Sequence, residues 1–213
     1  MSTEPGLRER KKQRTRQLIA EAARTLFQER GFDVVTVAEV ARAADVSEGT
    51  VFNYFPTKEA LFYSGMEAFE AQLVEAVRAR PVGESVLQAF QRFVLDGTGR
   101  LATEEVADAI ATAARIVGES RALQAREREV VAEYTHELAA LIAAETRVGE
   151  HTVEPLTAAS ALMAAQRALV AYVHASVRAG KRGPKLAADT RREGKRAFAR
   201  LERGLADYAV KRS

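Results

Sequence analysis

The chain has 213 residues, and 47% of them are hydrophobic, which is enough to bury the core of one large or two small domains. It contains no Cys, and this excludes disulfides, thiolate zinc sites and a cysteine nucleophile. The three histidines, at 136, 151 and 174, do not have the spacing of metal ligands, and we expect none of them to bind one. The GxSxG, P-loop and dinucleotide motifs are also absent. We therefore expect no enzyme, no metal and no cofactor.

The net charge is only +3, but the positive charge is concentrated near the N-terminus. The basic residues there are Arg8, Arg10, Lys11, Lys12, Arg14 and Arg16, and Glu9 is the only acidic residue among them. Because residues 1–13 have no apolar periodicity, we expect a flexible basic arm that lies along phosphates or enters a minor groove. The alternative is a solvated tail. The segment lacks the apolar region of a signal peptide, and no uninterrupted run reaches the roughly 18 apolar residues of a membrane span, so we expect a cytoplasmic protein without a membrane partner.

An amphipathic helix is predicted from Arg16 to Arg30, and Gly31 ends it. Its apolar residues recur at the spacing of one helical face: Ile19, Ala22, Ala23, Leu26 and Phe27. This face would cover the two helices that follow and complete a three-helix domain.

Two short helices are predicted next, with a turn of about three residues between them. Thr36 and Glu39 have the spacing of a capping box, which marks the start of the first of these helices. One apolar face then follows, formed by Val37, Val40, Ala41 and Ala44. The pattern breaks at Asp45, a residue type that tolerates turn geometry, and Ser47 caps the next helix, residues 48–54.

The second short helix presents small and hydrogen-bonding side chains, as a helix that enters a DNA major groove does. Gly49 would allow close approach, Thr50 and Tyr54 can bond phosphates or base edges, and Asn53 can pair with adenine. Lys58, at the start of the following helix, can neutralise a phosphate. The alternative is two short helices in an ordinary helical bundle, since periodicity does not separate recognition from packing.

Residues 14 to 62 closely resemble the N-terminal DNA-binding domain of the tetracycline-repressor (TetR) family. The resemblance rests on Arg14-Thr15-Arg16, Ala22-Ala23, Leu26-Phe27, Gly31-Phe32, Thr36-Val37, Val40-Ala41, Ala44, Val46-Ser47, Gly49-Thr50-Val51, Asn53-Tyr54-Phe55 and Lys58-Glu59-Ala60-Leu61. It implies a helix-turn-helix domain over residues 14–60. With Arg14 of the basic segment, the expected DNA-binding residues are Thr36, Val37, Ser47, Glu48, Gly49, Thr50, Phe52, Asn53, Tyr54 and Lys58. Phe52 stands where many members have Tyr, so an apolar contact with a thymine methyl or a ribose would replace a hydroxyl contact.

Beyond Pro56 the pattern is helical throughout, and Thr57 caps a long connecting helix that continues to Pro81. Ser85 and Gln88 form a second capping box, which opens a helix that ends in a loop at residues 96–99. Further helices are predicted over residues 103–117, 121–144, 155–179 and 185–211. No strand pattern occurs, so we predict an all-α fold of about nine helices, with residues 61–213 forming a ligand-binding and dimerisation domain.

The last two helices are candidates for self-association. Residues 155–179 are rich in Ala and apolar on several sides, and the final helix carries a stripe of Phe198, Leu201, Leu205 and Tyr208. Packing within the chain could bury both. The family resemblance instead implies that they pair with their copies in a four-helix interface. Such a homodimer would place two recognition helices about 34–36 Å apart on a pseudo-palindromic operator.

An effector pocket is expected among the middle helices. Residues 115 to 135 resemble the ligand-binding domain of a subgroup associated with acyl-CoA-like effectors. A cavity lined by Phe69, Leu73, Phe90, Phe93, Ile110, Tyr134 and Met163 would be mainly apolar, although each of these residues could equally be plain core. No cluster of buried carboxylates points to a cationic ligand. We therefore expect a repressor of operator DNA that a small apolar or acyl-type effector releases; the alternative is an architectural DNA binder that senses nothing.

Arg167 is the one certain charge between Leu156 and Val177. A buried lone guanidinium is costly, so it must reach solvent or have a partner. Three interpretations remain open: the edge of the dimer interface, plain exposure, or an anchor formed with Gln166 for the anionic or carbonyl end of an acyl ligand.

Overall fold

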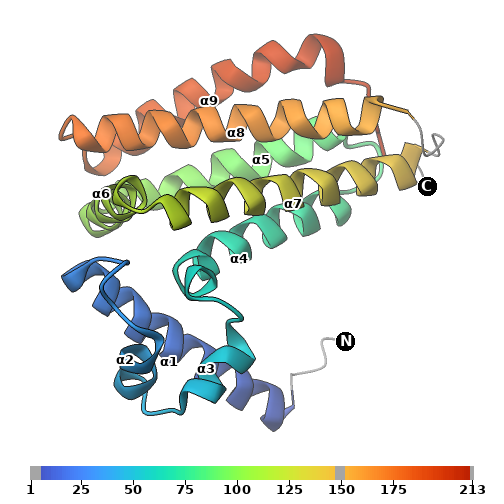
Figure 1. Cartoon of the computed structure of the whole chain (residues 1–213). Coiled ribbons are helices and arrows are strands. Elements are labelled where there is room, and N and C mark those ends of the chain that lie inside the picture. Colours follow the sequence, from blue (N-terminus) through green and yellow to red (C-terminus); the bar gives the residue numbers. More distant parts are fainter. Residues whose placement is uncertain (1–5, 147–151, 212–213) are drawn as a thin grey trace. The chain divides into compact units, whose positions relative to one another are not determined.

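The computed structural model describes residues 6–146 and 152–211, and it confirms the all-α prediction (Figure 1). The helices are α1 (Leu7–Arg30), α2 (Val37–Ala43), α3 (Glu48–Tyr54), α4 (Lys58–Arg78), α5 (Val86–Gly97), the 3-10 helix η1 (Thr98–Ala102), α6 (Glu104–Glu119), α7 (Arg121–Thr146), α8 (Glu154–Arg178) and α9 (Gly183–Leu205). Within the described residues there is no strand, and a single β-bridge joins Ser85 to Val210.

The chain divides into two compact units. The first contains the residues up to Glu67 together with Arg115–Glu127, and the second contains Ala68–Ala114 and the residues from Arg128 onward. Helices α4, α6 and α7 therefore each contribute to both units. The sequence placed the boundary at residue 60 and did not predict that residues 115–127 join the N-terminal helices.

The predicted caps of the helix-turn-helix are confirmed. The Thr36 hydroxyl accepts from the Glu39 amide at 3.2 Å, and the Glu39 carboxylate accepts from the Thr36 amide at 2.8 Å. The Ser47 hydroxyl oxygen accepts from the Thr50 amide at 3.1 Å and caps α3. Between the two helices, Asp45 has a φ of 54°, in the left-handed region that Asp enters more readily than most residues. These local signals set the start and the turn of both helices.

The core of the first unit forms around three phenylalanines, Phe27, Phe32 and Phe62, whose ring centroids lie 5.1 to 6.2 Å apart. Residues from every helix of the unit are buried with them, including Ile19, Val40, Val51, Phe55, Leu61, Ile116 and Leu123. The last two belong to the α6–α7 corner. The Tyr63 hydroxyl also donates to the carbonyl of Leu123 at 2.9 Å, so the corner is packed and hydrogen-bonded into this unit.

The start of α1 differs from the prediction. The helix begins at Leu7 rather than Arg16, so residues 7–13, which the sequence placed in a flexible arm, are helical. Apolar periodicity is needed only where a helix is buried, and the Arg, Lys and Gln residues of this stretch are good helix formers that remain exposed. Residues 1–5 of the predicted arm lie outside the described residues.

The second unit is built around α4, α5, α7, α8 and α9. Its buried core includes Leu73, Phe90, Leu138, Ile142, Leu162, Met163 and Phe198, with the rings of Phe90 and Phe198 5.9 Å apart. Helices α8 and α9 run side by side (Figure 1). Gly194 permits the close approach of α9, because a Cβ at this position would lie 2.7 Å from Leu95 Cδ2 and 3.2 Å from Leu169 Cδ2.

The apolar stripe predicted for the last helix packs against the core of the second unit. Phe198 is fully buried, and Leu201, Leu205 and Tyr208 pack against the same core while partly buried. The predicted end of this helix at residue 211 was wrong, because α9 ends at Leu205. Beyond it the backbone is bound elsewhere: the Lys211 amide donates to the Glu84 carbonyl at 3.2 Å, and Arg80 donates to the carbonyl of Ala209 at 2.8 Å.

The predicted loop at residues 96–99 is also wrong. Helix α5 continues to Gly97, and Thr98–Ala102 form η1. The buried Thr98 hydroxyl donates to the carbonyl of Leu95 at 2.7 Å, within this continuous helical stretch.

By length and composition alone, α8 is long and apolar enough to cross a membrane. Its residues Ala158, Leu162, Met163 and Leu169 are nevertheless buried in the core of the second unit.

Candidate nucleic-acid interface and effector residues

Helix α3 has one buried and one accessible side. Val51 is fully buried, and Phe55, which follows the helix, is buried beside it. The accessible side carries the predicted contact residues: Ser47, Glu48, Gly49, Phe52 and Asn53 are exposed, and Thr50 and Tyr54 are half-buried. A Cβ on Gly49 would meet only Ser47 Oγ, at 3.8 Å, so packing within the chain does not require glycine there. The helix is thus free to approach a partner along the side that the sequence predicted.

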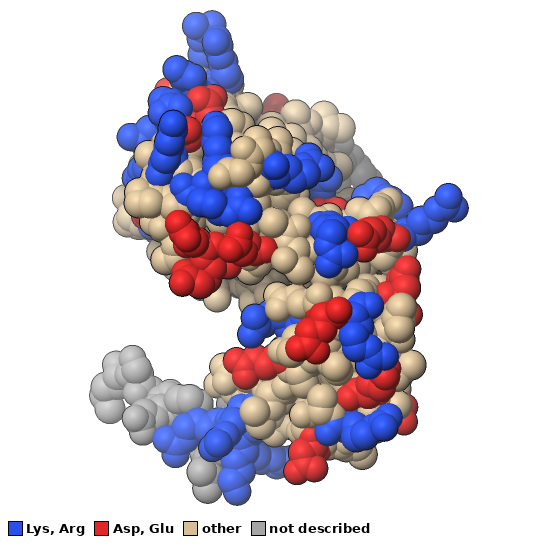
Figure 2. Space-filling view, turned by 90° about the vertical axis from the view of Figure 1, so that its left-hand side faces the viewer, with Lys and Arg blue, Asp and Glu red and all other residues tan. Residues whose placement is uncertain are grey.

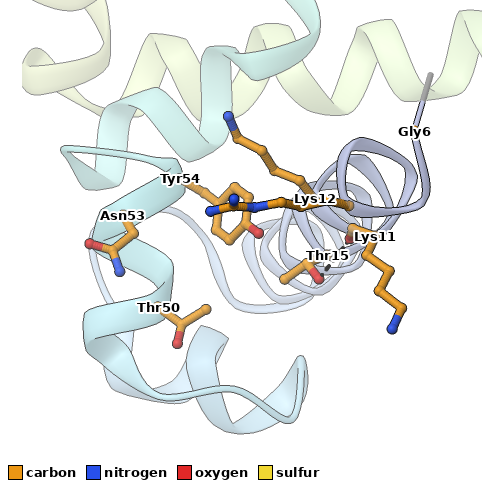
Figure 3. A pocket seen from close by; sticks show the side chains of 8 residues that line it. Gly6, Lys11, Lys12, Thr15, Thr50, Asn53 and Tyr54 are labelled. Atoms are coloured by element: carbon orange, nitrogen blue, oxygen red, sulfur yellow. Dashed lines mark hydrogen bonds between the residues drawn. The ribbon is translucent and has the colours of Figure 1, made fainter.

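An open hollow of about 820 Å³ separates α3 from the beginning of α1. Thr50, Asn53 and Tyr54 line it from α3, and the residues that line it from the other side are Gly6, Arg8, Lys11, Lys12 and Thr15 (Figure 3). Figure 2 shows Lys and Arg side chains gathered at this end of the first unit. The basic residues predicted to form an arm are therefore carried on a helix, next to the polar side of α3.

Arg16 fixes the end of α3 against α1. Its guanidinium donates to the carbonyl of Tyr54 at 2.8 Å and lies 4.3 Å from the ring centroid of Phe55. A cation at a helix C-terminus is favoured by the helix dipole, and the contact with an aromatic face adds a cation–π interaction. Arg16, which the sequence grouped with the phosphate-binding residues, is thus a positioning residue for α3.

Lys58 lies at the start of α4, where Thr57 Oγ1 accepts from the Ala60 amide at 3.1 Å. Its Nζ donates to the carbonyl of Asp33 at 3.3 Å and lies 4.3 Å from the ring centroid of Phe32. Partial burial lowers the pKa of Lys58 below its usual value. A phosphate at this position would compete with the Asp33 carbonyl for the ammonium group.

The remaining predicted DNA contacts lie in the same unit. Arg14 is exposed on α1, Thr36 is exposed at the start of α2, and Val37 is half-buried beside it. Thr36 already serves the capping box. The pKa of Glu39 in that box is lowered to about 2, first by the hydrogen bond from the Thr36 backbone and then by Arg30, whose Nη1 lies 2.8 Å from Glu39 Oε1. The box and the ion pair together hold α2 against the end of α1.

The structure brings most of the predicted effector residues together, but as packed core. Leu73, Phe90 and Met163 are buried in the core of the second unit, and Phe93 and Tyr134 pack against it. Phe69 joins them, with its ring centroid 5.3 Å from that of Phe93. Ile110 does not, because it packs in a separate cluster with Leu101, Ala107, Val173, Val177 and Leu186.

Gln166 and Arg167 face different surroundings, although they are adjacent in α8. Gln166 is 6% exposed and its Nε2 donates to Glu70 Oε1 at 3.1 Å, whereas Arg167 is exposed. Among the described residues Arg167 has no hydrogen bond or ion pair, although its charge acts on Glu70. The structure therefore does not bring the two side chains together as an anchor for an anion.

Glu70 was not predicted from the sequence. It is 3% exposed, and burial raises its pKa, with the Gln166 hydrogen bond and the Arg167 charge acting in the opposite direction. The signal that could have found it is its position in α4, one turn after Met66 and one turn before Leu73 on the apolar side of that helix. A carboxylate in an apolar stripe needs a partner or a function.

Among the described residues, no cluster of His, Asp and Glu side chains forms a candidate metal site. His136 is exposed, with its Nδ1 2.8 Å from the carbonyl of Ala132, and His174 is half-buried in α8. His151 lies outside the described residues.

Comparisons with known proteins agree on the N-terminal helices. Residues 19–64 match the family model for "Bacterial regulatory proteins, tetR family". Over 85 residues the chain is 38% identical to the HTH-type transcriptional regulator TcmR of Streptomyces glaucescens. This match covers 40% of the chain and spans only 38% of the length of TcmR.

Solved structures share the fold over nearly the whole chain. NalD, the secondary repressor of the MexAB-OprM multidrug efflux pump in Pseudomonas aeruginosa, superposes with a TM-score of 0.53 at 24% identity, covering 91% of this chain and 98% of NalD. A complex of SmeT with triclosan gives a TM-score of 0.56 at 16% identity, covering 93% of this chain and 96% of SmeT. At these identities the likeness shows a common fold.

Proposed function

Because residues 19–64 match the family model for bacterial regulatory proteins of the tetR family, we propose that the chain is a transcriptional regulator. It would repress by binding a pseudo-palindromic operator as a homodimer. One observation carries the proposal: the accessible side of α3 and the basic end of α1 border the same open hollow. The side chains of α1 would hold phosphates, and Thr50 and Asn53 would reach base edges. Binding to operator DNA would place the protein in the cytoplasm.

A recognition helix of seven residues contacts few bases, so tight binding calls for two copies. The accessible side of α8 supports a dimer through α8 and α9. Leu156 and Val170 remain 43% and 40% exposed there, and the exposed alanines Ala164, Ala168, Ala171 and Ala175 would let another helix approach closely. The family resemblance supports the same pairing.

We also propose that a small molecule bound in the second unit releases the operator. Helices α4, α6 and α7 run through both units, and the α6–α7 corner is bonded into the first unit. A ligand that shifts these helices would change the separation of the two recognition helices. To reverse a 99:1 preference between two forms, it must bind one form about 10⁴-fold more tightly, a difference of about 5.5 kcal/mol.

Two observations bear on the chemistry of the effector. The resemblance of residues 115 to 135 implies an acyl-type effector, but residues 115–127 belong to the first unit and not to the unit of the proposed pocket. The apolar residues of the second-unit core, Leu73, Phe90 and Met163, favour a ligand with an apolar body, whatever its head group.

The test is selection of DNA from a random pool, followed by fluorescence anisotropy of the selected duplex at increasing salt. We expect two inverted half-sites centred about 34–36 Å apart, and an affinity that falls steeply with salt. If the protein instead bound all DNA sequences of the pool equally well, the result would support the alternative of an architectural DNA-binding protein that senses nothing. Sedimentation of the selected complex would then count the copies of the chain on each duplex, and a single copy would contradict the dimer.

A further inference from the structure

A buried polar pair joins α4 to α8 inside the second unit. Gln166 Nε2 donates to Glu70 Oε1 at 3.1 Å, and both residues are more than nine-tenths buried. The second oxygen of each group, Glu70 Oε2 and Gln166 Oε1, is buried without a hydrogen-bond partner among the described residues. The two side chains therefore share one hydrogen bond, and two of their oxygen atoms accept none.

Unpartnered buried acceptors are rare in folded proteins because each has lost its water without gaining a donor. A carboxylate is the costlier case, since its charge is also removed from water. Both orphan atoms are acceptors, so neither residue can satisfy the other while Glu70 is ionised. Each of the two oxygens therefore lacks a hydrogen-bond donor.

The charges around the pair indicate which donor fits. Arg167 makes no hydrogen bond to Glu70 among the described residues, and its exposed guanidinium is screened by solvent. The buried carboxylate is screened far less. An anionic head group beside Glu70 would meet a like charge, whereas an ammonium group brings three N–H donors and the opposite charge.

We propose that Glu70 and Gln166 form the polar end of the effector site and accept hydrogen bonds from the protonated amine of a ligand whose body is apolar. Leu73 and Met163, one turn from Glu70 and Gln166 on the same helices, belong to the buried core and supply the apolar surroundings for that body. The inference rests on the proposed function, since it gives the chemical class of the molecule that would release the operator. It replaces the anionic anchor that the sequence indicated at Gln166 and Arg167.

Two other arrangements would satisfy the same atoms without a ligand. An internal water could donate to both oxygens, or a proton on Glu70 could be donated to Gln166 Oε1. Either one would make the pair a purely structural bridge between α4 and α8. The experiment must therefore separate a ligand site from a bridge.

The probes are 4-phenylbutylamine and 4-phenylbutanoate, which share a carbon skeleton and differ in the head group. Calorimetric titration of the full chain at neutral pH is expected to show the amine binding at least about tenfold more tightly than the carboxylate, as charge-assisted hydrogen bonds provide. Glu70→Gln should remove this preference. Glu75→Gln, at an exposed position on the same helix, should leave it unchanged. Equal or tighter binding of the carboxylate overturns the proposal, and so does the absence of binding by both probes.

A second measurement needs no ligand. The double variant Glu70→Met/Gln166→Leu replaces the pair with apolar side chains of similar size. If the pair is kept for binding, its thermal midpoint should equal or exceed that of the wild type, because two unsatisfied oxygens are removed. A lower midpoint would show that the pair is a structural bridge and would overturn the proposal.

Operator binding separates this inference from the proposed function. Glu70→Gln should bind the selected operator with wild-type affinity but should no longer release it with the amine. If selection yields no operator, the proposed function fails, while calorimetry still reports the preference for a head group.

Discussion

The hydroxyl of Ser120 donates a hydrogen bond to the carboxylate of Asp33 at 2.9 Å, and this bond joins the α6–α7 corner to the loop between α1 and α2. Ser120 is 2% exposed. The bond from Tyr63 to the carbonyl of Leu123 lies in the same unit. A segment from the middle of the chain therefore completes the packing of the DNA-binding helices.

Replacing Ser120 with Ala should loosen this corner. Removal of a partly buried hydrogen bond typically lowers the free energy of unfolding by about 0.5–1.5 kcal/mol. Hydrogen exchange should accordingly become faster at the amides of residues 115–127. Ser160→Ala, an exposed position in α8, is the matched control and should change neither quantity. Unchanged exchange in the Ser120 variant would mean that apolar packing of Ile116 and Leu123 holds the corner without the bond.

Lys58→Ala should weaken operator binding by a similar factor for every DNA sequence, because a phosphate contact carries no base information. The slope of log affinity against log salt should fall by about 1. Lys195→Ala removes the same charge from an exposed position on α9, in the second unit, and should leave the slope unchanged. If Lys58→Ala left the salt slope as unchanged as Lys195→Ala does, Lys58 would contact Asp33 and Phe32 but no phosphate.

Asn53→Ala should relax sequence preference at one position in each half-site. A good contact between an amide side chain and a base edge provides about 1–3 kcal/mol of discrimination. Binding to duplexes substituted one base pair at a time will locate that position. A uniform loss over all duplexes would instead assign Asn53 to the phosphate backbone.

Arg80 is the least exposed charged residue described, at 1% exposure. It pairs with Glu145 and donates to the carbonyls of Val77, Glu84 and Ala209. Arg80→Leu removes the ion pair with Glu145 and the side-chain donor to the Ala209 carbonyl. It should lower the free energy of unfolding by about 3 kcal/mol, the lower end for a broken buried pair because Glu145 is partly exposed.

The matched control is Arg78→Leu on the same helix. Arg78 is half exposed and pairs with Glu75, so its loss should cost less than about 1 kcal/mol. Urea unfolding measures both variants. Equal effects would contradict the role of Arg80 in fixing the C-terminal residues.

The lowered pKa of Glu39 predicts that the stability of the helix-turn-helix decreases in acid. Its pKa is lowered from 4.5 to about 2, so the folded form binds this proton more weakly than the unfolded chain. The resulting stabilisation is complete above pH 4.5 and disappears as the pH falls toward about 2. In Glu39→Gln this contribution is absent at every pH. The thermal midpoints of wild type and variant should therefore converge on acidification, and a constant difference would exclude the ionised carboxylate as the cause.

The sequence by itself determined the local features of α2, α3 and α5. Thr36 with Glu39, Ser47 with Thr50 and Ser85 with Gln88 act over three residues, so spacing alone predicts their hydrogen bonds. The spacing of the apolar residues in the sequence also predicted the buried face of α1. The accessible side of α3 followed from the inward positions of Val51 and Phe55.

Tertiary structure alone decided the contacts between distant segments. Ser120 and Asp33, Glu70 and Gln166, and Arg80 and Glu145 are paired across 87, 96 and 65 positions in the chain. The sequence around an isolated Glu or Ser does not identify its hydrogen-bond partner, because the pairing depends on which helices pack together. The ends of α1 and α9 were also mispredicted. Exposed residues that favour helix formation extend the start of α1 to Leu7. The residues that follow α9 are bound to Arg80 and Glu84 instead of continuing the helix.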